Sequence, residues 1–142
     1  MKNRYPIKFT PILKEKIWGG EKLKKVLKKN SISNNVGESW ELSGVDGDVS
    51  VVSNGSLKGT LLTNLIENNK EALVGKAVYE KFGNTFPLLF KFIDANDDLS
   101  IQLHPNDALA KKRHNSFGKT EMWYVVDADK QSKLYVGFDK EY

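Results

Sequence analysis

The residues best suited to chemistry lie in the last third of the chain, in the stretch SIQLHPNDALAKKRHNSFGKTEMWYVV. Gln102 and His104 are two positions apart, so on a strand their side chains point to the same face, about 6.6 Å from each other. Glu121 follows after an interval that suits two neighbouring antiparallel strands joined by an irregular excursion. The spacing therefore predicts an amide, an imidazole and a carboxylate on one face of a sheet.

Spacing alone leaves two interpretations of this polar set open. Glutamine, histidine and glutamate are common on a half-exposed sheet face that binds nothing. They are also suitable metal ligands, because imidazole and carboxylate bind zinc and an amide oxygen completes the set without adding charge. With Glu121 as the only anionic ligand, a divalent ion would remain a strong Lewis acid for a reaction that builds negative charge on oxygen. His114 lies in a basic polar stretch and is left out of the set.

Three strands and a short helix are expected to position these residues. Strict alternation over residues 99–104 predicts a strand with Ser100, Gln102 and His104 on one face, and Pro105 ends it. A helical turn or two is expected over residues 106–114. Strands over 118–128 and 132–138 follow, and Lys119 lies beside Glu121 at the start of the first of these.

The earlier part of the chain indicates further strands. The segment VGESWELSG alternates so that Glu38 shares a face with Trp40, and an edge strand with a solvated carboxylate is the plain alternative. Asn54-Gly55 predicts a two-residue hairpin turn, since both residues tolerate positive φ. The apolar run LLFKFI, residues 88–93, predicts a largely buried strand.

Two helices are expected between these strands. The first has an apolar stripe of Leu23, Val26 and Leu27 with lysines on its other face, and the second has Leu61, Leu62, Leu65 and Ile66 at helical spacing after a possible cap, Thr60. Trp18 precedes two glycines, a pair that suits either a tight turn or close approach of the backbone to a ligand.

The composition restricts the class of protein. The chain has 142 residues, is 39% hydrophobic and can bury one core. A net charge of +4 is too small to indicate a polyanion partner, so no nucleic acid is expected. There is no cysteine, which excludes a disulfide framework and a cysteine-ligated zinc site. The sequence has neither a secretory signal pattern nor a transmembrane run, so we expect a cytoplasmic protein without a membrane partner.

Four segments in this order carry a family resemblance: FTPILKEKIWGG, VGESWELS, FPLLFKFIDANDDLSIQLHP and GKTEMWYVVDA. Together they resemble the N-terminal part of type I mannose-6-phosphate isomerase, the zinc-dependent phosphomannose isomerase. The resemblance covers nearly the whole chain. Its most specific elements are the Ser-Ile-Gln-x-His-Pro strand and the Gly-Lys-Thr-Glu segment. The resemblance makes the metal site the favoured interpretation of the polar set.

The resemblance implies a mainly β fold, a cupin-type antiparallel β-sandwich or jelly roll with short appended helices. Residues 1–142 are then expected to form a single, incomplete catalytic domain. The family takes a fourth metal ligand, another histidine, and a catalytic arginine from a later stretch of chain. Exposed strand edges in such a domain favour self-association.

The resemblance also implies roles for individual residues. Gln102, His104 and Glu121 are the implied Zn²⁺ ligands, and Lys119 is the candidate for acid–base or oxygen-polarising work. Ser100 resembles a position that contacts the substrate phosphate, while Trp18 and Glu38 match segments that line the substrate pocket. The implied substrate is a phosphorylated hexose, and the implied reaction interconverts mannose 6-phosphate and fructose 6-phosphate through a cis-enediol.

Two alternatives to the isomerase are considered. One is a non-catalytic cupin module that binds a metal or a sugar and lacks the fourth ligand and the arginine. The other is a metal-dependent oxygenase, which a set with one motif histidine supports poorly, because oxygenases usually use two or more histidines.

Overall fold

The structure of the chain, a computed structural model, describes residues 5–137. Contacts divide the chain into two units, Met1–Ser100 and Ile101–Tyr142, which are described separately. The expectation of a single domain stays a prediction. Within the described part of the chain, no helix has both the length and the apolar character needed to cross a membrane. The elements are, in order, β1 (Ile12–Gly20), α1 (Lys22–Lys25), β2 (Val36–Ser43), η1 (Gly55–Leu57), α2 (Leu62–Asn69), α3 (Glu71–Val74), α4 (Lys76–Phe82), β3 (Leu89–Ile93) and α5 (Asp107–His114).

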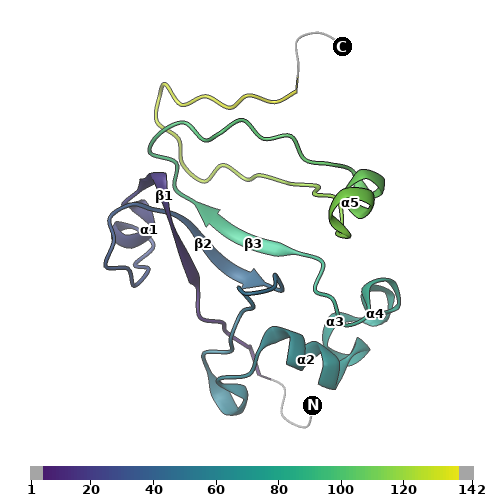
Figure 1. The fold of residues 1–142 in the computed structure, drawn as a ribbon. Helices are drawn as coiled ribbons and strands as arrows, with labels where there is room; N and C mark the ends of the chain where they lie inside the picture. The colour runs from purple at the N-terminus through teal and green to yellow at the C-terminus, as the bar shows by residue number, and fades with distance from the viewer. Residues whose placement is uncertain (1–4, 138–142) are drawn as a thin grey trace. The chain divides into compact units, whose positions relative to one another are not determined.

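The first unit contains an antiparallel sheet in the order β1-β2-β3, so β2 is its central strand (Figure 1). The register places Trp40 of β2 opposite Ile12 on one side and Lys91 on the other. The strand predicted over residues 88–93 is confirmed as β3, but its predicted burial is wrong. Phe90 and Phe92 share one face of β3 and are 58% and 41% exposed, whereas Leu89, Lys91 and Ile93 on the other face are half-buried.

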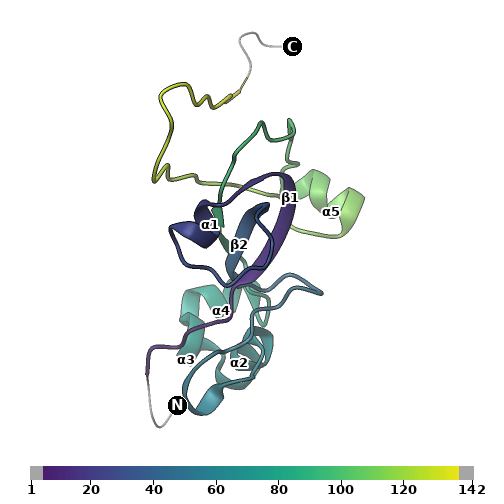
Figure 2. The same ribbon diagram turned by 90° about the vertical axis from the view of Figure 1, so that its left-hand side faces the viewer.

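The core of the first unit is built on α2. Leu62, Leu65 and Ile66 are buried with Val36 and Val52, which confirms the predicted apolar stripe except for Leu61, which precedes the helix and is 38% exposed. The cap position is Leu61 rather than the predicted Thr60, and no side chain accepts a hydrogen bond there. Figures 1 and 2 both show α2, α3 and α4 gathered beside one another beyond one end of the sheet.

The predicted Asn54-Gly55 hairpin turn is wrong. Gly55 has a positive φ of 65°, but Asn54 has φ −135°, and the chain continues into the 3₁₀ turn η1. The reason is tertiary, because the hydroxyl of Tyr5 donates to Asn54 O and accepts from Leu57 N. Asn54 Oδ1 in turn accepts from Lys8 N at 2.8 Å, so the loop is shaped by a segment far away in the sequence.

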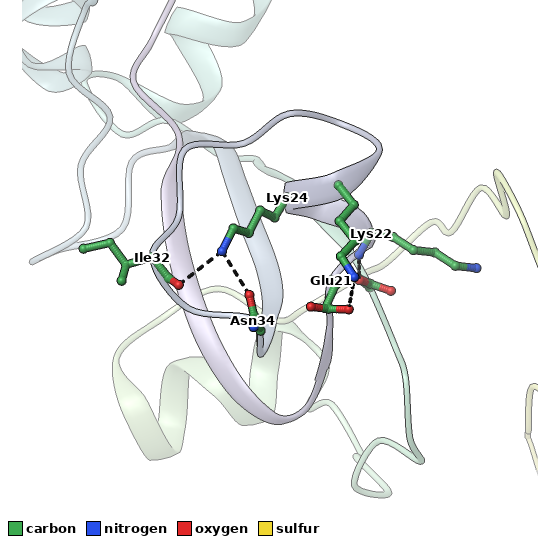
Figure 3. A network of polar contacts seen from close by, with 7 residues as sticks. Glu21, Lys22, Lys24, Ile32 and Asn34 are labelled. Atoms are coloured by element: carbon green, nitrogen blue, oxygen red, sulfur yellow. Dashed lines mark hydrogen bonds and ion pairs between the residues drawn. The ribbon is translucent and has the colours of Figure 1, made fainter.

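Helix α1 is only four residues long, and the apolar stripe predicted for it is confirmed only in part. Leu23 is buried, whereas Val26 and Leu27 lie beyond the end of the helix and are exposed. Lys24 Nζ donates to Ile32 O at 3.2 Å and to Asn34 Oδ1 at 2.9 Å (Figure 3). These bonds tie the loop after α1 back onto the helix.

The strands predicted in the second part of the chain are wrong for the residues that the structure describes. Segments 99–104, 118–128 and 132–137 run as extended chain without strand pairing, and Phe138 lies outside the described residues. Beyond α5, Figure 1 shows the chain doubling back on itself as such a trace. A strand needs a hydrogen-bonded neighbour, and without one the alternating apolar side chains stay in solvent; Ile101 and Leu103 are 103% and 84% exposed.

Helix α5 confirms the helix predicted over residues 106–114. Asn106 is its N-cap, and the Asn106 side chain accepts a hydrogen bond from Leu109 N at 3.0 Å. His114 is its last residue and is exposed, as predicted. Asp107 Oδ1 accepts a hydrogen bond from Gly118 N at 2.8 Å, and Pro105 O accepts one from Lys119 N at 3.2 Å, so the segment after the helix is held at its first turn.

Candidate active site

Three of the predicted site residues meet at the Glu121 carboxylate in the second unit. His104 Nε2 lies 3.2 Å from Glu121 Oε2, and Lys119 Nζ lies 3.1 Å from Glu121 Oε1. The side chains of His104 and Glu121 are 24% and 30% exposed, so the contact is partly shielded from water but open to a ligand. The structure thus brings together an imidazole, a carboxylate and an ammonium group that come from both sides of α5.

Gln102 lies two residues before His104 on the same extended segment and is exposed. Among the described residues, no three histidine, cysteine, aspartate or glutamate side chains are grouped closely enough to hold a metal ion. The predicted metal site takes its third protein donor from an amide oxygen, in addition to His104 and Glu121. Gln102 and Asn106 are each two residues from His104, and Asn106 Oδ1 accepts the capping hydrogen bond from Leu109 N. Gln102 is therefore the candidate amide, and the donor set of one nitrogen and two oxygens fits a divalent ion with an open position.

Glu38 is the most constrained candidate in the first unit. It is 8% exposed on the central strand, so the alternative of a solvated carboxylate on an edge strand is wrong. Trp40 Nε1 donates to its Oε2 at 2.8 Å, and Lys91 Nζ donates to its Oε1 at 2.9 Å. Burial acts to raise the pKa of Glu38, but the hydrogen bonds from Trp40 and Lys91 and the charges of Lys91 and Lys16 lower it below its usual value. Glu38 is thus held as a carboxylate.

Trp18 lies near the end of β1 and is half-buried. A Cβ atom at Gly37 would lie 2.6 Å from the ring atom Cζ3 of Trp18, so the absence of a side chain at Gly37 makes room for the indole. The glycines after Trp18 are explained by packing against protein rather than by a tight turn: a Cβ at Gly19 would lie 2.5 Å from Gly37 N, and one at Gly20 would lie 2.6 Å from Asp94 Oδ2.

Ser100 is exposed and is the last residue of the first unit. The predicted residues therefore fall into two groups. Trp18, Glu38 and Ser100 belong to the first unit, and Gln102, His104, Lys119 and Glu121 belong to the second. The second group alone contains the candidate metal donors and the lysine beside them.

Two lysines beside Glu38 were missed by the sequence analysis. Lys91 forms an ion pair with Glu38, and Lys14 Nζ lies 4.9 Å from the centre of the Trp40 ring while it also pairs with Asp48. A charged residue in the middle of the apolar run LLFKFI is the signal that could have drawn attention to Lys91. Its partner could not be found without the register between β2 and β3.

A family model described as phosphomannose isomerase type I, catalytic domain, matches residues 7–134. A mannose-6-phosphate isomerase from Streptococcus mutans is 40% identical over 129 residues, which are 88% of this chain and 38% of the relative. The mannose-6-phosphate isomerase ManA of Bacillus subtilis is 40% identical over 133 residues, 93% of this chain and 40% of the relative.

The structure is similar to a crystal structure of mannose 6-phosphate isomerase from Bacillus subtilis. The TM-score is 0.78 at 38% sequence identity, and the match covers 89% of this chain and 39% of the other. This similarity confirms the predicted fold class, an antiparallel β fold with short appended helices. The chain spans about two fifths of the length of these relatives.

Proposed function

This chain belongs to the type I phosphomannose isomerases, whose catalytic-domain model covers nearly all of it, and from that premise we propose that it provides the metal-binding part of an enzyme that interconverts mannose 6-phosphate and fructose 6-phosphate. The observation that carries this proposal is the meeting of His104 and Lys119 at the two oxygens of the Glu121 carboxylate. These are the residues that the reaction needs, namely donors for a divalent ion and a group able to exchange a proton.

We propose that Gln102, His104 and Glu121 hold Zn²⁺. His104 and Glu121 are already in contact, so their donor atoms need only separate slightly to receive an ion between them. These three side chains together carry a single negative charge, so a bound divalent ion would keep a net positive charge. When bound, the ion supplies Lewis-acid stabilisation of the negative charge that develops on the sugar oxygens during enolisation.

Lys119 is the proposed proton-exchanging residue. Isomerisation removes a proton from the carbon next to the aldehyde of the open-chain sugar and returns a proton to the neighbouring carbon, through a cis-enediol. An acid–base residue has to stand within reach of these atoms. Lys119 lies 3.1 Å from Glu121 with a side chain that is 45% exposed, so it can turn from the carboxylate towards a bound sugar.

Trp18, Glu38 and Ser100 are proposed to bind the phosphorylated hexose. Glu38 is held ionised, and its carboxylate keeps lone pairs that can accept hydrogen bonds from sugar hydroxyl groups. The indole of Trp18 offers a flat apolar surface to the sugar ring. The hydroxyl of Ser100 is exposed and can donate to a phosphate oxygen.

The proposal is tested by measuring zinc content and mannose 6-phosphate isomerisation on the wild-type chain, on His104→Ala and on His114→Ala. The expected result is about one zinc per chain with turnover in the wild type and in His114→Ala, and loss of both in His104→Ala. His114 is the matched control, because it is the other histidine of the chain and is exposed at the end of α5.

The second candidate is a module that binds the metal and the sugar without turnover. The contact of His104 with Glu121 supports this candidate too, because both candidates use the same metal donors. Zinc binding that depends on His104 but is accompanied by no isomerisation would support this candidate. Equal zinc content in the wild type and His104→Ala would contradict both candidates.

A further inference from the structure

The chain that leads from Trp18 into α1 is held by a segment that follows β3. Asn96 N donates a hydrogen bond to Trp18 O at 2.9 Å. The next residue, Gly19, forms an isolated antiparallel bridge with Ala95. Trp18 is thus fixed at its backbone by residues about 75 positions later in the sequence, a connection that no local pattern predicts.

Asp94, at the start of the same segment, adds a contact that is made by its side chain. Its Oδ2 accepts a hydrogen bond from Lys22 N at 2.6 Å, and its own backbone N donates to Gly37 O at 2.9 Å. Asp94 is 8% exposed, so the carboxylate is largely buried against the chain. Gly20 has no side chain, and a Cβ there would meet the Asp94 carboxylate, so the glycine provides the space that the contact needs.

The two contacts of Asp94 involve one residue next to the Trp18 ring and one residue that follows Trp18 in the sequence. Gly37, which accepts from the Asp94 backbone, is the residue over which the Trp18 ring lies. Lys22, which donates to the Asp94 side chain, ends the segment that carries Trp18 into α1. Asp94 therefore fixes both the support beneath the indole and the chain that follows it.

We propose that Asp94 is a positioning residue that holds Trp18 in place for binding of the phosphorylated hexose. Its carboxylate acts through the backbone of Lys22, its own backbone supports Gly37, and it does not contact the sugar. The inference rests on the proposed function, because the position of Trp18 affects activity only if Trp18 binds the sugar.

The first test is nuclear magnetic resonance of ¹⁵N-labelled chain, with the indole signal of Trp18 identified from Trp18→Phe. In Asp94→Ala we expect the Trp18 indole signal to move and the Lys22 amide to exchange about tenfold faster, the effect of losing one hydrogen bond to a charged acceptor. Asp94→Asn keeps an oxygen for Lys22 N and is expected to restore both signals. An unchanged indole signal and unchanged Lys22 exchange in Asp94→Ala would overturn the proposal.

Two further variants separate positioning from general stability. Gly20→Ala places a methyl group against Asp94 and is expected to reproduce the effects of Asp94→Ala, while the double variant should be no worse than Asp94→Ala alone. Ser50→Ala is the stability control, because its buried hydroxyl accepts from Ser43 N at a place away from Trp18. It should lower the melting temperature without moving the Trp18 signal, and additive effects in the double variant would count against the proposal.

The same Trp18 signal then reports on the sugar. Titration with mannose 6-phosphate should shift it in the wild type, with a dissociation constant several-fold higher in Asp94→Ala and unchanged in Ser50→Ala. Equal dissociation constants in the wild type and Asp94→Ala would overturn the role in sugar binding. A wild-type chain that does not respond to the sugar would contradict the proposed function instead, while the indole position and Lys22 exchange would still decide whether Asp94 fixes Trp18.

Discussion

The two units of the chain have the same kind of sequence pattern but different structures. In the first unit, the alternating segment that forms β2 pairs with β1 on one side and with β3 on the other. Alternating apolar residues in the second unit remain extended chain with their side chains in solvent; Met122 and Tyr124 are 91% and 85% exposed. Alternation therefore predicts which residues share a face, but a strand forms only where a neighbour completes the hydrogen-bond ladder.

The sharpest test of this difference is to remove the same side chain in each unit. Ile66→Ala removes a fully buried side chain of α2, and we expect the free energy of unfolding to fall by about 2–5 kcal/mol. Ile101→Ala, at 103% exposure, is expected to change it by less than about 0.5 kcal/mol. Urea unfolding followed by circular dichroism measures both, and equal effects would break the comparison.

The next effect concerns the ion pair on the central strand. Lys91→Met leaves the Glu38 carboxylate without its ammonium partner, and the side chains of this pair are only 20% and 10% exposed. We expect a loss of about 2 kcal/mol, between the values for exposed and fully buried pairs. Lys76→Met, which removes the far more exposed pair with Glu80, is the control and should cost less than about 0.5 kcal/mol on urea unfolding.

The pH dependence of the same cluster follows from the lowered pKa of Glu38. A carboxylate whose pKa is lower in the folded chain than its usual value near 4.5 contributes stability that is present above that value and is lost as the pH falls through the folded pKa. The stability difference between the wild type and Glu38→Gln should therefore be present at pH 7, shrink below about pH 4.5 and disappear in stronger acid. Thermal unfolding at a series of pH values measures it, and a constant difference would refute the assignment.

The smallest predicted effect lies in the second unit, at the cap of α5. Asn106→Ala removes the side-chain acceptor for Leu109 N and should destabilise the helix by about 1 kcal/mol. Amide hydrogen exchange over residues 107–114 should accelerate about five-fold, while exchange in β2 stays unchanged. Faster exchange in both places would mean that the two units unfold together.

Much of the candidate site could be predicted from the sequence, because its motifs are local. The contact of His104 with Glu121 is expected from their interval, although the paired strands on which that expectation rests are absent from the described residues, and α5 between them follows from the pattern after Asn106. The ligand roles of these residues stay predictions. The pairing of Glu38 with Lys91 could not be predicted, because it depends on a register between two segments about 50 residues apart.

The errors in the predicted fold have the same origin. Asn54-Gly55 has the composition of a tight turn, but Tyr5 imposes another loop through its hydroxyl group. The sequence left two explanations open for the glycines after Trp18, a tight turn or close approach to a ligand. The structure shows instead that Gly19 packs against Gly37 and Gly20 packs against Asp94. In each case the deciding contact comes from a distant part of the chain, which single-sequence patterns do not report.

The sheet order has a consequence for synthesis on the ribosome. β2 pairs with β3, and the chain between Ser43 and Leu89 carries η1 and the helices α2, α3 and α4. At elongation rates of about 5–20 residues per second, β2 waits between about 2 and 9 s for its second neighbour to be made. During that interval the new chain exposes one edge of β2, so nascent-chain chaperones would have their longest opportunity to bind between the emergence of β2 and that of β3.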